Sequence, residues 1–431
     1  MIGIKTIQIK EKIREKWNHS GFQRYFKNTG WLFFGRIAGM FISFFVAAYV
    51  ARYLGPENYG TLSYIVSLVG IFSFIASLGI DNVLYRDLIR YPERENELLG
   101  SGIFLKMIGS YLALVIASII LPILGNNHNV TILAFIAACS FLFQSFNVIL
   151  TFFQSKTLAK LVAISGLFVT LILSVFKIGF AIIQLNVHFF VYLLILEQIA
   201  YAIIFIILYQ RLGRSIFSWR INRKTTFGMW KESLPLMFSA AFILIYNRID
   251  QVMIKQMLDA SAVGYYDIAV RLSEFWYFVP TTIITALLPA IVNAKKVSVE
   301  IYRSRIKLLA VLVLVLSLLA SIIIFIFSKQ IVLSLFGSQY IPSISVLQIY
   351  VWAGVGMSIG ILANQYLVIE NSTKASFFAN FLGMFTNVIL NLILIPHHGI
   401  NGAAIATLIS YFVLPTIVII IKRAEIYVKK N

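Results

Sequence analysis

Long apolar stretches separated by short polar connections run along almost the whole chain. A helix that crosses the hydrocarbon core of a membrane needs about 20 apolar residues, and twelve stretches reach that length. We predict spans at 30–52, 60–80, 101–124, 131–153, 161–185, 189–209, 233–255, 263–288, 308–327, 343–366, 376–395 and 400–421. No connection is long enough for a separate folded domain. The pattern therefore predicts an all-α integral membrane protein with twelve transmembrane helices.

The composition supports this class. Of the 431 residues, 60% are hydrophobic and 12% are charged, and the mean hydropathy is +0.87. A soluble domain has about 25% charged residues. The single cysteine, Cys139, excludes an intrachain disulfide framework and a multi-cysteine metal site. The chain contains no phosphate-binding loop, zinc-protease motif or nucleophile elbow. We therefore expect no catalytic residue, no metal and no cofactor.

The basic residues indicate the orientation in the membrane. The 36 Lys and Arg outnumber the 17 Asp and Glu, which gives a net charge of +19 and in a soluble protein would suggest a nucleic-acid partner. However, 29 basic residues lie in the two tails and in one alternate set of connections, whereas the other set holds only Arg52, Lys255 and Lys329. Basic connections stay in the cytoplasm. We therefore predict both termini in the cytoplasm and no nucleic-acid partner.

An internal repeat divides the chain into halves. Residues 51–68 align with 255–272 at a constant offset, so that Gly60 matches Gly264, and 157–168 align more weakly with 373–384. Duplicated segments are common in transporters. The repeat predicts two six-helix bundles in this order: a cytoplasmic tail with a basic amphipathic helix (1–29), the first bundle (30–209), a cytoplasmic linker (210–232), the second bundle (233–421) and a cytoplasmic tail (422–431).

Charged residues inside the spans are the candidates for function, because charge within a membrane is costly and usually faces a polar cavity or a partner. Four are basic and four are acidic: Arg36, Lys177, Arg248, Arg271, Glu197, Asp250, Asp267 and Glu274. The cations could form a ladder for an anionic headgroup, especially a phosphate. The acids could pair with empty cations or carry H⁺, and coupling to H⁺ or Na⁺ stays open.

A structural role is the alternative for several of these charges. Asp267, Arg271 and Glu274 follow the i, i+4, i+7 spacing of one helix face, so they could form an ionic network that locks helices together. Arg36 and Lys177 could instead extend toward the membrane surface.

Four motifs occur in order along the chain: "LGPENYG" at 54–60, "SLPLMFS" at 233–239, "VGYY" at 263–266 and "GINGAAIAT" at 399–407. Together they resemble the Wzx-type polysaccharide flippases of the multidrug/oligosaccharidyl-lipid/polysaccharide exporter (MOP) superfamily. The resemblance implies a MATE-like V of two bundles with pseudo-two-fold symmetry. It also implies transport of polyprenyl-diphosphate-linked oligosaccharide units of O-antigen, lipopolysaccharide or capsule to the outer leaflet by alternating access.

The resemblance also bears on the site. It places Arg36, Arg248 and Arg271 at basic family positions and adds Arg86, which follows "LGI" after span 2. The expected substrate-binding set is Arg36, Arg86, Lys177, Arg248 and Arg271. It further implies a monomer in the bacterial inner membrane that cooperates with a polysaccharide polymerase and chain-length proteins.

Two other functions remain open. A MATE-type multidrug or cation antiporter would use Glu197, Asp250 and Glu274 for organic cations. A membrane glycosyltransferase or polymerase would present catalytic groups on sizeable outer loops, whereas the outer connections here are short.

Overall fold

The computed structural model describes residues 20–370, 372–418 and 420, and all regular elements in this part of the chain are helices. The amphipathic tail helix predicted before residue 20 and the C-terminal tail 422–431 lie outside the described residues. From Ser20 onward the chain already belongs to α2 (Ser20–Ser77).

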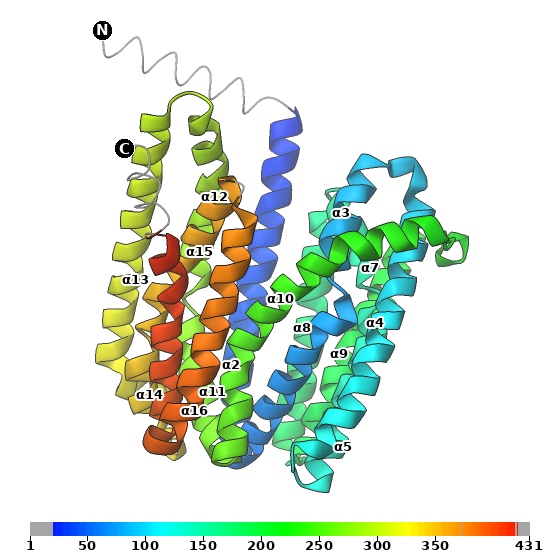
Figure 1. Cartoon of the computed structure of the whole chain (residues 1–431). Helices are drawn as coiled ribbons and strands as arrows, with labels where there is room; N and C mark the ends of the chain where they lie inside the picture. Colours follow the sequence, from blue (N-terminus) through cyan, green and yellow to red (C-terminus); the bar gives the residue numbers. More distant parts are fainter. Residues whose placement is uncertain (1–19, 371, 419, 421–431) are drawn as a thin grey trace.

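The described residues form ten helices that are long and apolar enough to cross a membrane. Two of them, Phe33–Ser77 and Lys374–Val418, contain 45 residues each, about twice the length of one crossing. Each is interrupted at a glycine with positive φ, Gly55 at 71° in α2 and Gly399 at 57° in α16 (Thr373–Tyr411). Figure 1 shows α2 and α16 reversing direction at the lower end of the molecule. If each of these two long helices crosses twice, the ten helices are consistent with the predicted number of twelve spans.

Two groups of helices meet at one end and are splayed apart at the other (Figure 1). The N-terminal group contains both limbs of α2, the first of which packs against α8, followed by α3 (Ile80–Arg90), α4 (Glu95–Ile123), α5 (His128–Ala138), α6 (Ser140–Gln144), α7 (Asn147–Ser155), α8 (Ala159–Ile182) and α9 (Val187–Arg211). The C-terminal group contains α10 (Arg223–Met257), α11 (Ala260–Glu274), α12 (Phe278–Lys295), α13 (Val299–Leu335), α14 (Ser343–Tyr350), α15 (Ala353–Ile369) and α16.

The two repeated segments pack against each other where the groups meet. A Cβ on Gly60 would lie 1.7 Å from the carbonyl oxygen of Ala260, and a Cβ on Gly264 would lie 2.2 Å from that of Pro56. Pro56 and Ala260 are themselves equivalent in the repeat. The contact is therefore reciprocal, as pseudo-two-fold symmetry requires, and only glycine permits this approach of α2 and α11.

Helix breaks shape the middle of the C-terminal group. The predicted span 263–288 is divided between α11 and α12 shortly before Pro280, which cannot donate a backbone hydrogen bond. The break places Trp276 beside α15, where a Cβ on Gly354 would lie 2.4 Å from its ring. The bends therefore occur near the proline and glycine residues of these spans.

Helix α10 connects both groups. Its first turns are held by the N-terminal group, where Arg94 donates to Thr225 Oγ1 at 2.7 Å and a Cβ on Gly79 would lie 2.7 Å from the backbone nitrogen of Met237. Its final turns pack against α16. The predicted boundary at 232/233 falls within this continuous helix, whose N-terminus is capped by Asn222.

Candidate functional site

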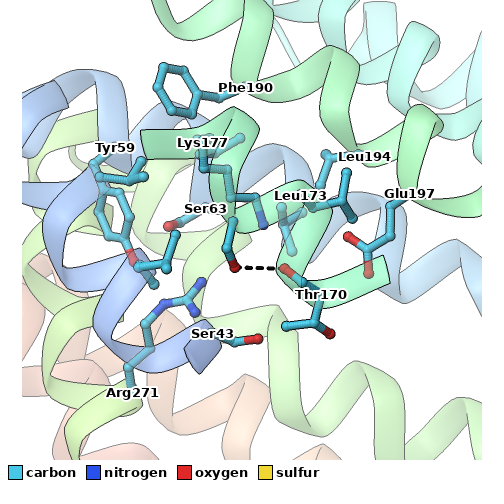
Figure 2. A pocket seen from close by; sticks show the side chains of 16 residues that line it. Ser43, Tyr59, Ser63, Thr170, Leu173, Lys177, Phe190, Leu194, Glu197 and Arg271 are labelled. Atoms are coloured by element: carbon cyan, nitrogen blue, oxygen red, sulfur yellow. Dashed lines mark hydrogen bonds between the residues drawn. The ribbon is translucent and has the colours of Figure 1, made fainter. Parts of the chain in front are cut away.

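Three of the predicted charges face one pocket in the N-terminal group. Lys177 of α8, Glu197 of α9 and Arg271 of α11 line a cavity of about 230 Å³ together with hydroxyl-bearing residues of α2 and α8. Figure 2 shows the three charged side chains entering this pocket from different helices. Arg271 is the member that comes from the C-terminal group, so the pocket is completed only where the two groups meet.

Asp267 holds Arg271 in place. The carboxylate is 2% exposed and accepts a hydrogen bond from Arg271 Nε at 2.6 Å, one from the Tyr59 hydroxyl at 2.8 Å and one from Gln251 Nε2 at 2.9 Å. Gln251 in turn accepts a hydrogen bond from Ser67. Tyr59 and Ser67 belong to the second limb of α2. The predicted one-face arrangement of Asp267 and Arg271 is therefore present, and it forms a network that joins the two helix groups.

A second cavity contains Arg36 and Glu274. It has a volume of about 350 Å³ and lies between the first limb of α2 and α10–α12, with Asn247 and Tyr277 also in its wall. The Tyr277 hydroxyl is buried and has no hydrogen-bond partner among the described residues. Arg248 interacts electrostatically with both Glu274 and Asp267. Arg248 thereby connects the charges of this cavity with those around Arg271.

Asp250 lies apart from these cations. It is 4% exposed and accepts hydrogen bonds from Tyr266 Oη at 2.7 Å, Thr407 Oγ1 at 2.5 Å and Asn391 Nδ2 at 2.5 Å. No Lys or Arg of the described chain forms an ion pair with it. The side-chain oxygen of Asn391 is buried nearby without a hydrogen-bond partner. Asp250 thus sits in a neutral, oxygen-rich cluster inside the C-terminal group.

Arg86 is not brought to either cavity. It lies on α3 with 52% of its side chain exposed and pairs with Asp87 and Glu232, at 2.8 and 2.7 Å. The hydrogen bonds that Arg86 donates to the carboxylates of Asp87 and Glu232 raise the pKa of Arg86 above its ordinary value. The other predicted cations, Arg36, Lys177, Arg248 and Arg271, lie at the two cavities or beside them.

Several polar partners were not among the predicted site residues. Asn387 and Asn391 are spaced i, i+4 in an otherwise apolar span, and this spacing alone could have marked a buried polar face. Thr407 and Tyr59 gave no comparable signal, because a threonine hydroxyl in an apolar helix usually bonds to its own backbone and Tyr59 is one of 21 tyrosines. Their roles appear only from packing between helices.

Comparisons with known proteins agree with this architecture. The model of the polysaccharide biosynthesis protein family matches residues 25–295, and the MatE family model matches residues 235–393. The chain is 23% identical over 395 residues to the capsular polysaccharide biosynthesis protein CapF of Staphylococcus aureus, which covers 90% of this chain and 96% of the relative.

Two solved structures show the same fold. An inward-facing multidrug resistance MATE family transporter of the MOP superfamily aligns with a TM-score of 0.70 at 15% identity, over 91% of this chain and 95% of that one. The lipid II flippase MurJ in an inward closed conformation aligns with a TM-score of 0.69 at 19% identity, over 92% and 87%. The chain therefore belongs to the polysaccharide biosynthesis protein family and is a multi-pass membrane protein with the fold of the MOP superfamily.

Proposed function

We propose that the protein is a flippase that moves polyprenyl-diphosphate-linked oligosaccharide units from the cytoplasmic to the outer leaflet. The observation that carries this proposal is the arrangement of intramembrane charge. Arg36, Arg248, Arg271 and Lys177 follow one another from the cavity between the groups into the pocket of the N-terminal group. Cations at successive positions offer a diphosphate favourable partners along its path.

Alternating access explains why the cations lie between two helix groups. In Figure 1 the groups are in contact at the end that holds the α2 turn and splayed at the end where α2 begins. The distribution of basic connections assigns the splayed end to the cytoplasm. We therefore propose that this state receives substrate from the cytoplasmic leaflet of a bacterial inner membrane and that rocking of the groups exposes it to the outer side, for use by a polymerase and chain-length proteins.

We propose that Asp250 carries the coupling cation. A buried carboxylate without a basic partner can take a proton, and the oxygens of Asp250, Asn391 and Thr407 also suit a hard cation such as Na⁺. Asp250 lies in the C-terminal group, away from the cationic cavities. Cation binding there can therefore alter helix packing without competing for the diphosphate.

A MATE-type exporter of organic cations is the second candidate, and the MatE match to residues 235–393 favours it. Such a function needs carboxylates that are free to bind a cation. Glu197 instead shares its pocket with Lys177, and Glu274 shares the second cavity with Arg36. Asp250 has no basic partner, but it is buried and enclosed by Tyr266, Asn391 and Thr407, so it is not open to an organic cation. Deletion of the gene should therefore lead to accumulation of lipid-linked glycan and leave drug resistance unchanged; the reverse result would favour the exporter.

The proposal is tested by the double substitution Arg248→Ala, Arg271→Ala in cells that lack the chromosomal copy. Surface polysaccharide should be lost, because two of the four cations on the path are removed, while the protein stays in the membrane. Lys329→Ala is the matched control, since Lys329 is exposed on α13, outside both cavities. Full surface polysaccharide in the double variant would refute the proposal.

A further inference from the structure

The pocket in the N-terminal group is too small for a whole oligosaccharide. Its volume is about 230 Å³, whereas sites for drug-sized ligands usually enclose about 300–1,000 Å³. It lies between α2, α8 and α9, with Arg271 at its edge. The pocket therefore has room for one small part of a lipid-linked glycan.

Two cations are directed into this space. Arg271 uses Nε to bond with Asp267, and Figure 2 shows its guanidinium group facing the pocket. Lys177 interacts electrostatically with Arg271 and Glu197, yet it forms no ion pair in the described part of the chain. Charges within a membrane usually pair with an opposite charge: Arg271 is paired with Asp267 on one side, and the space it shares with Lys177 can hold a further anion that contacts both cations. A phosphate group fits this requirement.

A carboxylate and a hydroxyl face the same space. Glu197 lines the pocket from α9, and the buried Ser63 hydroxyl at its wall has no hydrogen-bond partner among the described residues. A free phosphate ion would be repelled by Glu197. A ligand that carries hydroxyl or amide donors next to its phosphate would instead be bound by both, because an ionised carboxylate only accepts hydrogen bonds.

We propose that this pocket binds the junction between the diphosphate and the first sugar of the substrate. The phosphate next to the sugar lies between Lys177 and Arg271, and Glu197 accepts hydrogen bonds from hydroxyl or acylamino groups of the sugar. The inference rests on the proposed function, because it takes a diphosphate-linked glycan as the substrate. In this arrangement Glu197 recognises the first sugar. The rest of the glycan extends into the larger cavity of Arg36 and Glu274.

The test is calorimetric binding to the full chain purified in detergent, with inorganic phosphate, glucose 1-phosphate and N-acetylglucosamine 1-phosphate as probes. At least one sugar phosphate should bind about tenfold more tightly than phosphate, the gain expected from hydrogen bonds to a charged acceptor. Glu197→Gln should abolish that preference without weakening phosphate binding. Lys177→Gln should weaken binding of all three probes.

Two further variants keep the outcome interpretable. Glu57→Gln changes an exposed acid of the α2 turn, outside both cavities, and should leave the preference intact, whereas Ser63→Ala should weaken binding a few-fold without unfolding the helices. Equal binding of phosphate and sugar phosphates, no binding at all, or an unchanged preference in Glu197→Gln would each overturn the inference. Sugar-phosphate preference in a protein that moves no lipid-linked glycan would refute the proposed function and leave the pocket assignment standing.

Discussion

At the scale of single residues, neighbours decide what each intramembrane acid does. Asp267 and Asp250 are both almost fully buried. Asp267 has Arg271 as its partner, whereas Asp250 is surrounded by neutral donors from Tyr266, Asn391 and Thr407. The sequence predicted the spacing of Asp267 and Arg271 on one face, but not the partners from distant helices. Hence the sequence left open which acid is structural.

The pairing of Asp267 predicts a non-additive effect on stability. Asp267→Leu should destabilise the protein by on the order of 3 kcal/mol, because it leaves Arg271 without its partner in the membrane. The value lies at the low end for buried pairs, since 38% of the Arg271 side chain is exposed. The double variant Asp267→Leu, Arg271→Met should regain much of this loss. Thermal unfolding in detergent measures the stability of the single and double variants. If the losses of stability in the two single variants simply add up in the double variant, the two residues do not form a paired network.

At the scale of elements, hydropathy located the long apolar helices better than it located their ends. Helix α13 runs from Val299 to Leu335, beyond the predicted 308–327, and α10 begins at Arg223 rather than near 233. Hydropathy marks only the part of a helix inside the hydrocarbon, whereas backbone hydrogen bonding continues into the polar interface. The breaks at Gly55 and Gly399 lie between predicted spans. At each glycine the backbone has a positive φ, and the chain turns back there.

The glycine contact between α2 and α11 predicts a gate at the closed end. Gly60→Ala would bring a methyl group within 1.7 Å of the Ala260 carbonyl oxygen, so the two helices must separate. Spin labels at the exposed positions Glu57 and Leu258 should therefore report a longer or broader distance distribution than in the parent protein. Transport should fall as well.

A matched control exists for this substitution. Gly166→Ala introduces the same methyl group on α8, where no atom lies within 4 Å. It should change neither the label distances nor transport. An unchanged distance distribution in Gly60→Ala would contradict the idea that this contact holds the two groups together at their closed end.

At the scale of the whole molecule, Asp250 lies apart from the cationic cavities. We therefore expect that cation coupling can be removed without loss of substrate binding. Asp250→Asn keeps the size and most hydrogen bonds of the side chain but removes the negative charge. In vesicles, transport by this variant should no longer respond to an imposed pH or Na⁺ gradient, whereas binding of the lipid-linked substrate should persist. Glu57→Gln at the exposed α2 turn is the control. Retained gradient dependence would exclude Asp250 as the coupling acid.

The assembled site was only partly accessible from the sequence. Depth along each span marked Arg36, Lys177, Arg248 and Arg271 as candidate site residues, and the structure places all four at the cavities or beside them. Arg86 was included through family resemblance, and the structure places it on the exposed surface with acidic partners. The cavities themselves arise from contacts between helices far apart in the chain, which hydropathy does not encode.

The proposed flippase activity can be measured as transport by the purified protein. Proteoliposomes are loaded with polyprenyl-diphosphate-linked oligosaccharide in one leaflet, and the fraction that reaches a lectin or glycosidase on the other side is measured over time. We expect protein-dependent movement that is lost in the Arg248→Ala, Arg271→Ala variant and kept in Lys329→Ala. Equal rates in empty liposomes and with the parent protein, or full movement by the double variant, would contradict it.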